Sequence, residues 1–286
     1  MVKRYRAAAK SGHLETQLRL GQIYLHGEHL KKPRYQDARD YFFLAARQGS
    51  AEPQCELGWL YYQGRSVDEN PAEAIRYLRL AADQGNVTAA GRLGWIHFQG
   101  RKTFKWRVVR GRVKETKNPV KNHRIAVSWL RRAAESGDVD SMHGLAICLL
   151  EGKGIKVQLA EGMRWLRAAA KHCVHSARLH LGLVLREGKH GELANGTESL
   201  KWLKRAAASN ESDVFLNALD KIWRMYFYGE CVPKNYCVAR LWLGKTLRHA
   251  AEEDALAAMV DIYEKGLGTK ANPRKAEYWS KRLSVF

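Results

Sequence analysis

The sequence predicts an all-α protein, a solenoid of about seven helix pairs, because two helical patterns alternate along the chain. The first pattern is an apolar stretch closed by glycine, clearest in "LGQIYLHG", "LGWLYYQG" and "LGWIHFQG". Its closing glycines recur at intervals of 37, 36, 52, 36, 41 and 37 residues, at Gly27, Gly64, Gly100, Gly152, Gly188, Gly229 and Gly266. The second pattern lies between them, as in "AIRYLRLAADQG" and "AVSWLRRAAESG". Since each pair buries its apolar face only by stacking on its neighbours, residues 1–286 are predicted to form a single repeat domain.

Local signals indicate how each pair packs, begins and ends. A glycine inside the first helix, such as Gly58, costs about 1 kcal/mol relative to alanine and therefore needs a packing reason. We expect the close approach of an alanine pair in the second helix, such as Ala81 and Ala82, to supply that reason. The closing glycine is expected to form a left-handed C-cap. Asn-Pro pairs that begin at Asn70 and Asn272 predict two starts of second helices.

These motifs resemble the Sel-one-like repeat, a relative of the tetratricopeptide repeat. The shared features are the L-G-x-x-Y-x-x-G helix, a polar loop, and a second helix that ends in W-x-x-x-A-A-x-x-G. The resemblance covers about residues 5–286, and repeats 4, 6 and 7 depart from it because Ala146, Trp223 and Val260 replace the glycine inside the first helix. It implies a right-handed α-solenoid that serves as a protein-binding scaffold, usually without catalysis, whose first helices line the concave surface.

The start of the chain resembles the end of a repeat. "MVKRYRAAAKSG" matches the last part of a second helix, so we expect a preceding segment: a first helix, a secretion signal or a lipid anchor. Association with a membrane is expected only through such a segment, because no apolar run approaches the roughly 18 to 20 residues that cross a bilayer. Bacterial members of the family are often exported, which favours the periplasm, with the cytoplasm as the alternative.

The five cysteines divide into two kinds. Cys55 and Cys148 occupy apolar positions of first helices and are expected to be small buried hydrophobes. Cys231 and Cys237 flank the loop of repeat 6 in "CVPKNYC". Some exported members of the family link such hairpins by disulfides, so this pair is a candidate disulfide, with two reduced thiols as the alternative.

Positive charge is concentrated in one segment, "RKTFKWRVVRGRVKETKNPVKN", which occupies residues 101–122. Nine Lys or Arg residues against one Glu give this basic insertion a net charge of +8 out of +20 for the chain. It follows Gly100 directly, in the loop of repeat 3, and accounts for the 52-residue interval. Apolar and basic residues alternate in "FKWRV", and Arg110-Gly111 is expected to turn the chain back through "RVKET" into a short β-hairpin.

A binding surface is predicted where this insertion meets the first helices of repeats 2 and 3. The position after the glycine inside the helix and the position three residues later share one side of the helix. We expect the partner to contact these positions and the insertion, through Trp59, Tyr62, Trp95, Phe98, Phe104, Trp106, Arg107, Arg110 and Arg112. The alternative is that the four helical rings pack against neighbouring repeats.

Catalytic and metal-binding motifs are missing from the sequence. It contains no G-x-S-x-G, P-loop or H-E-x-x-H, and His172, Cys173 and His175 lack the spacing of a standard zinc site. We therefore predict a protein that is not an enzyme and that has no cofactor, metal or small-molecule substrate.

The predicted function is a scaffold that captures a protein partner, one that is acidic because the chain is basic. The sharpest hypothesis rests on the resemblance: a bacterial immunity protein that neutralises a secreted antibacterial effector, such as a type VI phospholipase. One alternative is an adaptor in signalling or envelope assembly. Another is a binder of nucleic acid or an anionic surface through the insertion. Against nucleic acid, the chain has no recognised nucleic-acid module, and the charge of +12 outside the insertion is spread over many helices.

Overall fold

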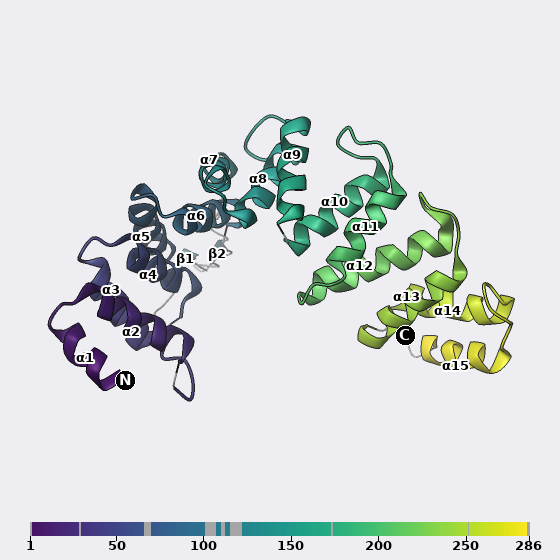
Figure 1. The fold of residues 1–286 in the computed structure, drawn as a ribbon, viewed down its shortest axis with the longest axis horizontal. Coiled ribbons are helices and arrows are strands. Elements are labelled where there is room, and N and C mark those ends of the chain that lie inside the picture. The colour runs from purple at the N-terminus through teal and green to yellow at the C-terminus, as the bar shows by residue number, and fades with distance from the viewer. Residues whose placement is uncertain are drawn as a thin grey trace. The chain divides into compact units, whose positions relative to one another are not determined.

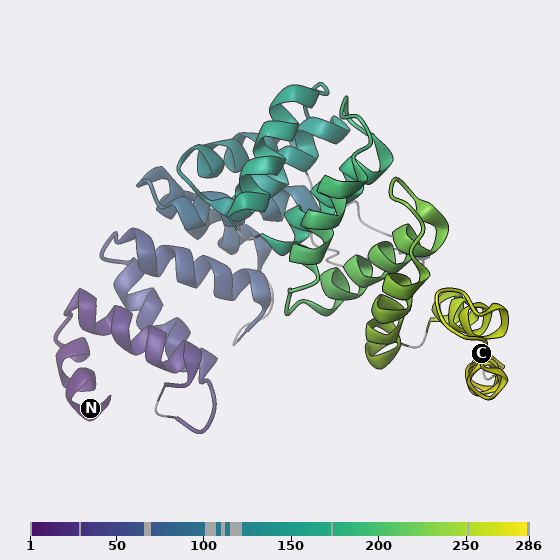
Figure 2. The same cartoon turned by 45° about the vertical axis from the view of Figure 1, so that its right-hand side comes forward.

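The computed structural model describes residues 2–28, 30–65, 70–100, 107–109, 112–114, 122–172, 174–250 and 252–284. Helix pairs follow one another along the chain in both views (Figures 1 and 2). The chain divides into two compact units, Met1–Val157 and Gln158–Phe286. The predicted all-α class and the paired repeats are confirmed. That residues 1–286 form a single domain stays a prediction.

Unit 1 contains eight of the described helices and two short strands. They are α1 (Val2–Lys10), α2 (Leu14–His26), α3 (Tyr35–Ala46), α4 (Ala51–Gln63), α5 (Pro71–Asp83), α6 (Val87–Gln99), β1 (Arg107–Val109), β2 (Arg112–Lys114), α7 (His123–Glu135) and α8 (Val139–Glu151). The most extensive contacts join the two helices of a repeat: α2 with α3, α4 with α5, and α6 with α7.

Unit 2 continues the pattern. Its elements are α9 (Leu159–Lys171), α10 (His175–Glu187), α11 (Gly196–Ala206), α12 (Ser212–Arg224), the π-helix η1 (Met225–Gly229), α13 (Tyr236–His249), α14 (Glu253–Lys265) and α15 (Pro273–Leu283). Helices α14 and α15 lie side by side at the end of the chain in both views (Figure 2). No described helix is long and apolar enough to cross a membrane.

The helix ends follow the local signals. Asn70 and Asn272 cap α5 and α15 by accepting hydrogen bonds from backbone N–H groups three residues later, at 3.2 and 3.0 Å. The closing glycine adopts the left-handed conformation after α2, α4, α8, α10 and α14. Gly100 differs, with φ 58° and ψ 133°, so the chain leaves α6 in a more extended direction. This departure lies where the basic insertion begins.

Strands β1 and β2 confirm the β-hairpin expected in the insertion. They pair antiparallel, with Val108 opposite Val113 and Val109 opposite Arg112. This register leaves a two-residue connection at positions 110 and 111, which lie outside the described residues.

The glycine inside each first helix packs differently from the sequence expectation. A Cβ on Gly94 would lie 2.7 Å from Leu130 Cδ2 and 3.1 Å from the Leu130 backbone nitrogen. Gly58 likewise faces Leu78, the residue three positions before its alanine pair. The expectation that the alanines supply this contact is therefore wrong: the glycine admits a large apolar side chain from the second helix of its own repeat.

The alanine pair of α5 belongs to a cluster that reaches into the next repeat. Ala81 and Ala82 of α5 lie in one buried cluster with Ala89 and Ala90 of α6. Small side chains on both helices bring consecutive repeats close together, which extends the core from one repeat to the next.

Two glycine substitutions should have opposite effects on stability. Gly94→Ala should lower the free energy of unfolding by about 1–3 kcal/mol, because the new methyl group overlaps buried Leu130. Gly244→Ala in α13 should raise it by about 1 kcal/mol, because a Cβ there meets no atom within 4 Å and alanine favours the helix. Urea unfolding followed by circular dichroism measures both. Equal effects of the two changes would contradict the packing role of Gly94.

Candidate protein-binding site

Four aromatic side chains lie in two pairs on neighbouring first helices of unit 1. On α4 the rings of Trp59 and Tyr62 stack, with centroids 5.2 Å apart. On α6 the rings of Trp95 and Phe98 meet edge to face at 5.4 Å. All four side chains are half-buried. We call these four residues the ring site.

Each pair of rings in the ring site is partly covered by the first helix of the following repeat. The Arg92 guanidinium of α6 lies 4.9 Å from the centre of the Trp59 ring. The same guanidinium donates to Glu56 at 2.9 Å and to the Cys55 carbonyl at 3.2 Å, which joins α6 to α4. A Cβ on Gly144 of α8 would lie 3.2 Å from Trp95 Cζ2. Each tryptophan therefore packs between repeats with one part of its ring and leaves another part at the surface.

Both ends of the basic insertion meet at the ring site. The Gly100 N–H donates to the Ile96 carbonyl at 3.0 Å, and the Asn122 N–H donates to the His97 carbonyl at 2.9 Å. The chain thus leaves and returns at the last turn of α6, and the Phe98 ring lies 5.6 Å from the His123 ring. The expected proximity between the insertion and these aromatic positions is confirmed for its two attachment points.

The structure places the remaining predicted contact residues only in part. Arg107 begins β1 and Arg112 begins β2. Phe104, Trp106 and Arg110 lie outside the described residues, so their part in binding stays a prediction.

Sequence reasoning missed the cations that border the rings. These cations are Arg92, which lies over Trp59, and Lys153, whose ammonium lies 5.3 Å from the centre of the Phe98 ring. Lys153 follows α8, so the sequence offered no local signal that it approaches α6. Each is also paired with a glutamate, Arg92 with Glu56 at 2.9 Å and Lys153 with Glu151 at 2.6 Å.

The candidate disulfide does not form in the structure, where Cys231 and Cys237 are both free thiols. The Cys231 thiol donates to the Arg186 carbonyl at 3.1 Å, and the Cys237 thiol donates to the Gly268 carbonyl at 2.9 Å. Cys231 has a positive φ of 57°, whereas Cys237 lies in the first turn of α13. The two side chains are thus directed to different neighbouring loops, and this correction favours the alternative of two reduced thiols.

The buried thiols are unsuited to nucleophilic chemistry. Burial raises the pKa of Cys55 and of Cys148 to about 11 each, so both stay protonated at neutral pH. Both are buried, as the sequence indicates. Among the described residues, no group of three or more His, Cys, Asp or Glu side chains could hold a metal ion.

The helix pairs and their repeated caps define a helical-repeat protein. The Sel1 repeat model matches residues 14–50, 54–86, 117–138, 139–172, 175–211, 224–246 and 254–284. These segments make up more than half of the sequence, and the chain belongs to the Sel1 repeat family. The gap after residue 86 contains α6 and most of the basic insertion.

Similar proteins come from fungi and bacteria. Chitin synthase regulatory factor 3 of Schizosaccharomyces pombe is 28% identical over 160 residues, 53% of this chain, but the match spans only 16% of that much longer protein. The solved structure of a protective antigen of uropathogenic Escherichia coli strains, which displays this repeat fold, is 25% identical with a TM-score of 0.77. It covers 98% of this chain and 56% of the antigen.

Two further solved structures share less sequence. A Sel1 repeat protein from Oxalobacter formigenes is 24% identical with a TM-score of 0.69, and covers 99% of this chain and 75% of that one. An immunity protein from Pseudomonas aeruginosa is 13% identical with a TM-score of 0.46, and the match covers 82% of this chain and 81% of that one. The first shows the fold alone, and the second likeness is too weak to support an argument about function.

Proposed function

We propose that this chain is a non-catalytic scaffold that captures an acidic protein partner through the ring site and the basic insertion. One observation carries the proposal: both ends of the insertion meet beside Phe98, at the last turn of α6. The surface part of the rings therefore lies beside the two points at which the +8 segment is attached.

Rings and cations contribute to such an interface in different ways. Partly exposed Trp, Tyr and Phe side chains supply apolar area that a partner can bury, and such residues often dominate binding energy. Lys and Arg at the rim raise the association rate of an acidic partner and help select it. Arg92 and Lys153 line the rings, and their charges are balanced by Glu56 and Glu151, so the positive field at this surface comes from the insertion.

The finer proposal names the kind of partner. The partner would be a secreted antibacterial effector, such as a type VI phospholipase, which the chain neutralises as an immunity protein in the periplasm. Its support is the resemblance stated above and the presence of one elaborated loop on an otherwise regular array, which suits a single cognate partner.

The test uses the product of the neighbouring gene as the candidate partner and isothermal titration calorimetry as the measurement. Replacing residues 101–121 by a short Gly-Ser loop should weaken binding by about 100-fold or more, because it removes the cations and rings of the insertion. The melting temperature should stay almost unchanged, since Gly100 and Asn122 keep their bonds to α6. Binding that survives this replacement would remove the insertion from the site.

The rings need a control that separates packing from contact with the partner. Trp59→Ala should weaken binding by about 1–4 kcal/mol. Trp279→Ala is the matched control, because Trp279 of α15 is also half-buried under a guanidinium, that of Arg282 at 5.1 Å. It should reduce stability to a similar extent and leave binding intact. Equal binding by both variants would assign Trp59 to packing alone.

A nucleic-acid probe distinguishes the rival function. If the insertion instead bound DNA, the affinity for a short duplex would fall steeply with salt, with a slope that reports several phosphates. Loss of that affinity on replacing the insertion, together with no binding of the candidate partner, would favour the rival.

A further inference from the structure

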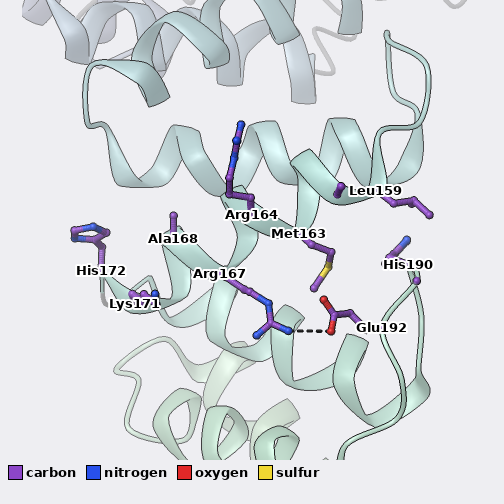
Figure 3. A pocket seen from close by; sticks show the side chains of 11 residues that line it. Leu159, Met163, Arg164, Arg167, Ala168, Lys171, His172, His190 and Glu192 are labelled. Atoms are coloured by element: carbon purple, nitrogen blue, oxygen red, sulfur yellow. Dashed lines mark hydrogen bonds and ion pairs between the residues drawn. The ribbon is translucent and has the colours of Figure 1, made fainter.

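A pocket of about 760 Å³ lies between α9 and the loop that follows α10, in unit 2 (Figure 3). Its apolar lining comes from Leu159, Met163 and Ala168. Arg164 and Lys171 stand on the same helix, and His190 and Glu192 come from the loop (Figure 3). Nothing in the ring site involves these residues.

One lining residue of the pocket, Ala168, is small at a position where other second helices carry a large side chain. In α7, α11 and α13, a cation three residues after the aromatic residue covers the aromatic ring. Arg132 lies over Trp129 at 5.5 Å, Arg205 over Trp202 at 5.0 Å, and Lys245 over Trp242 at 4.3 Å. The corresponding residue of α9, three after Trp165, is Ala168. A small side chain thus lines the pocket at a position where α7, α11 and α13 carry a cation.

The cations around the pocket differ in whether a carboxylate pairs with them. Arg167 is neutralised by Glu192 at 2.9 Å and by Glu198 at 3.0 Å. Arg164 and Lys171 are exposed and have no hydrogen bond or ion pair with another described residue. Two positive charges at the pocket are thus available to a ligand.

Positive charge is also concentrated on the second helices of unit 2. Counting Lys and Arg against Asp and Glu, the second helices α9, α11, α13 and α15 carry +2, +2, +3 and +3. The first helices α10, α12 and α14 carry +1, 0 and −3 by the same count. An anionic ligand is accordingly attracted to the second helices.

We propose that this pocket binds an extended acidic segment of a protein, in which two carboxylates flank an apolar side chain. Arg164 and Lys171 are seven residues apart, about 10.5 Å along a helix. An extended peptide advances about 3.3 Å per residue and points successive side chains to opposite faces, so residues i, i+2 and i+4 face the pocket together. Carboxylates four residues apart span about 13 Å, and the long Arg and Lys side chains close the remaining difference. The apolar side chain between them rests on Met163 and Ala168. This site is independent of the proposed function, which rests on unit 1.

The experiment uses the full chain and a fluorescent heptapeptide, Gly-Glu-Ser-Leu-Ser-Glu-Gly, followed by fluorescence anisotropy. Ala168→Leu should fill part of the pocket without changing its charge and weaken binding about tenfold or more; the fold should tolerate it, because Leu80 occupies the same helix position in α5. Arg164→Ala and Lys171→Ala should each weaken binding by about three- to tenfold. Affinity should also fall as salt rises.

Arg274→Ala is the matched control, since Arg274 is an exposed cation of a second helix outside this pocket. It removes the same charge as Arg164→Ala and should leave the affinity within about twofold of the parent. Equal losses for Arg274→Ala and Arg164→Ala would reduce the effect to net charge and overturn the proposal. Absence of binding at about 1 mM peptide would also overturn it. So would binding of phosphatidylserine vesicles, abolished by Ala168→Leu, without binding of the peptide.

Discussion

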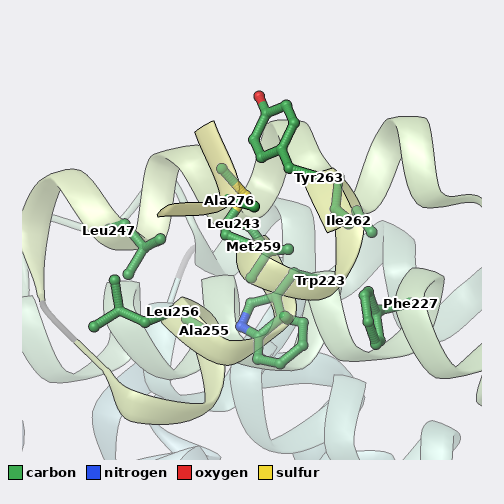
Figure 4. Close-up of a cluster of buried hydrophobic side chains, with 12 residues drawn as sticks. Trp223, Phe227, Leu243, Leu247, Ala255, Leu256, Met259, Ile262, Tyr263 and Ala276 are labelled. Carbon is green, nitrogen blue, oxygen red and sulfur yellow. The ribbon is translucent and has the colours of Figure 1, made fainter. Parts of the chain in front are cut away.

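Trp223→Ala is expected to lower the free energy of unfolding of unit 2 by about 3–5 kcal/mol. Trp223 is fully buried at the end of α12 and belongs to a cluster with Leu243 of α13 and with Met259 and Ile262 of α14 (Figure 4). Removing the indole leaves a cavity shared by three helices, which the surrounding helices fill only in part. Urea unfolding followed by circular dichroism measures the loss.

Two further variants show whether the volume of Trp223 is the cause. Trp223→Gly restores the residue typical of the family, and it should nevertheless destabilise at least as strongly as alanine. Leu243 of α13, which belongs to the same cluster, would leave much of the indole volume empty, and the π-helix η1 begins two residues after Trp223. Tyr278→Ala, at an aromatic residue with 55% of its surface exposed, should change stability by about 0.5 kcal/mol or less. A stable Trp223→Gly variant would contradict this account.

Leu130→Ala is expected to destabilise unit 1 by about 3–5 kcal/mol. Leu130 of α7 has no exposed surface, and it lies against Gly94 of α6 and Gly144 of α8. Its side chain therefore packs within one repeat and against the next, so the change opens a cavity at both contacts. Thermal and urea unfolding both measure the effect.

Leu80→Ala is the matched control in the same unit. Leu80 lies on α5 with 42% of its surface exposed, so the same change of atoms should cost about 0.5 kcal/mol or less. Similar losses for the two leucines would mean that Leu130 does not bridge neighbouring repeats.

Local features of the structure were predictable because neighbouring residues determine them. Asn70 and Asn272 cap their helices within the next three residues. Glycine adopts the left-handed C-cap conformation at little cost, so positions such as Gly64 mark helix ends. The pairing of Val108 with Val113 likewise follows from a two-residue connection between short strands.

The candidate binding site was predictable only in part. The spacing of Trp59 and Tyr62 indicates that they share one side of α4, since residues three apart are neighbours on a helix. How far the next repeat covers Trp59 depends on Arg92, which lies 33 positions later in the sequence. No local pattern reports such a contact.

By itself, the sequence determined the periodic helix pairs, their caps and the attachment of a basic insertion after α6, because these depend on hydrogen bonds and residue preferences within a few positions. Only the tertiary structure decided which side chain fills the space beside Gly94 and that Cys231 and Cys237 face different loops. It also decided that Ala168 lines a pocket. The physical reason is that packing depends on distances between helices. A small residue can admit a neighbouring helix or leave a space, and only the arrangement of the surrounding helices distinguishes the two.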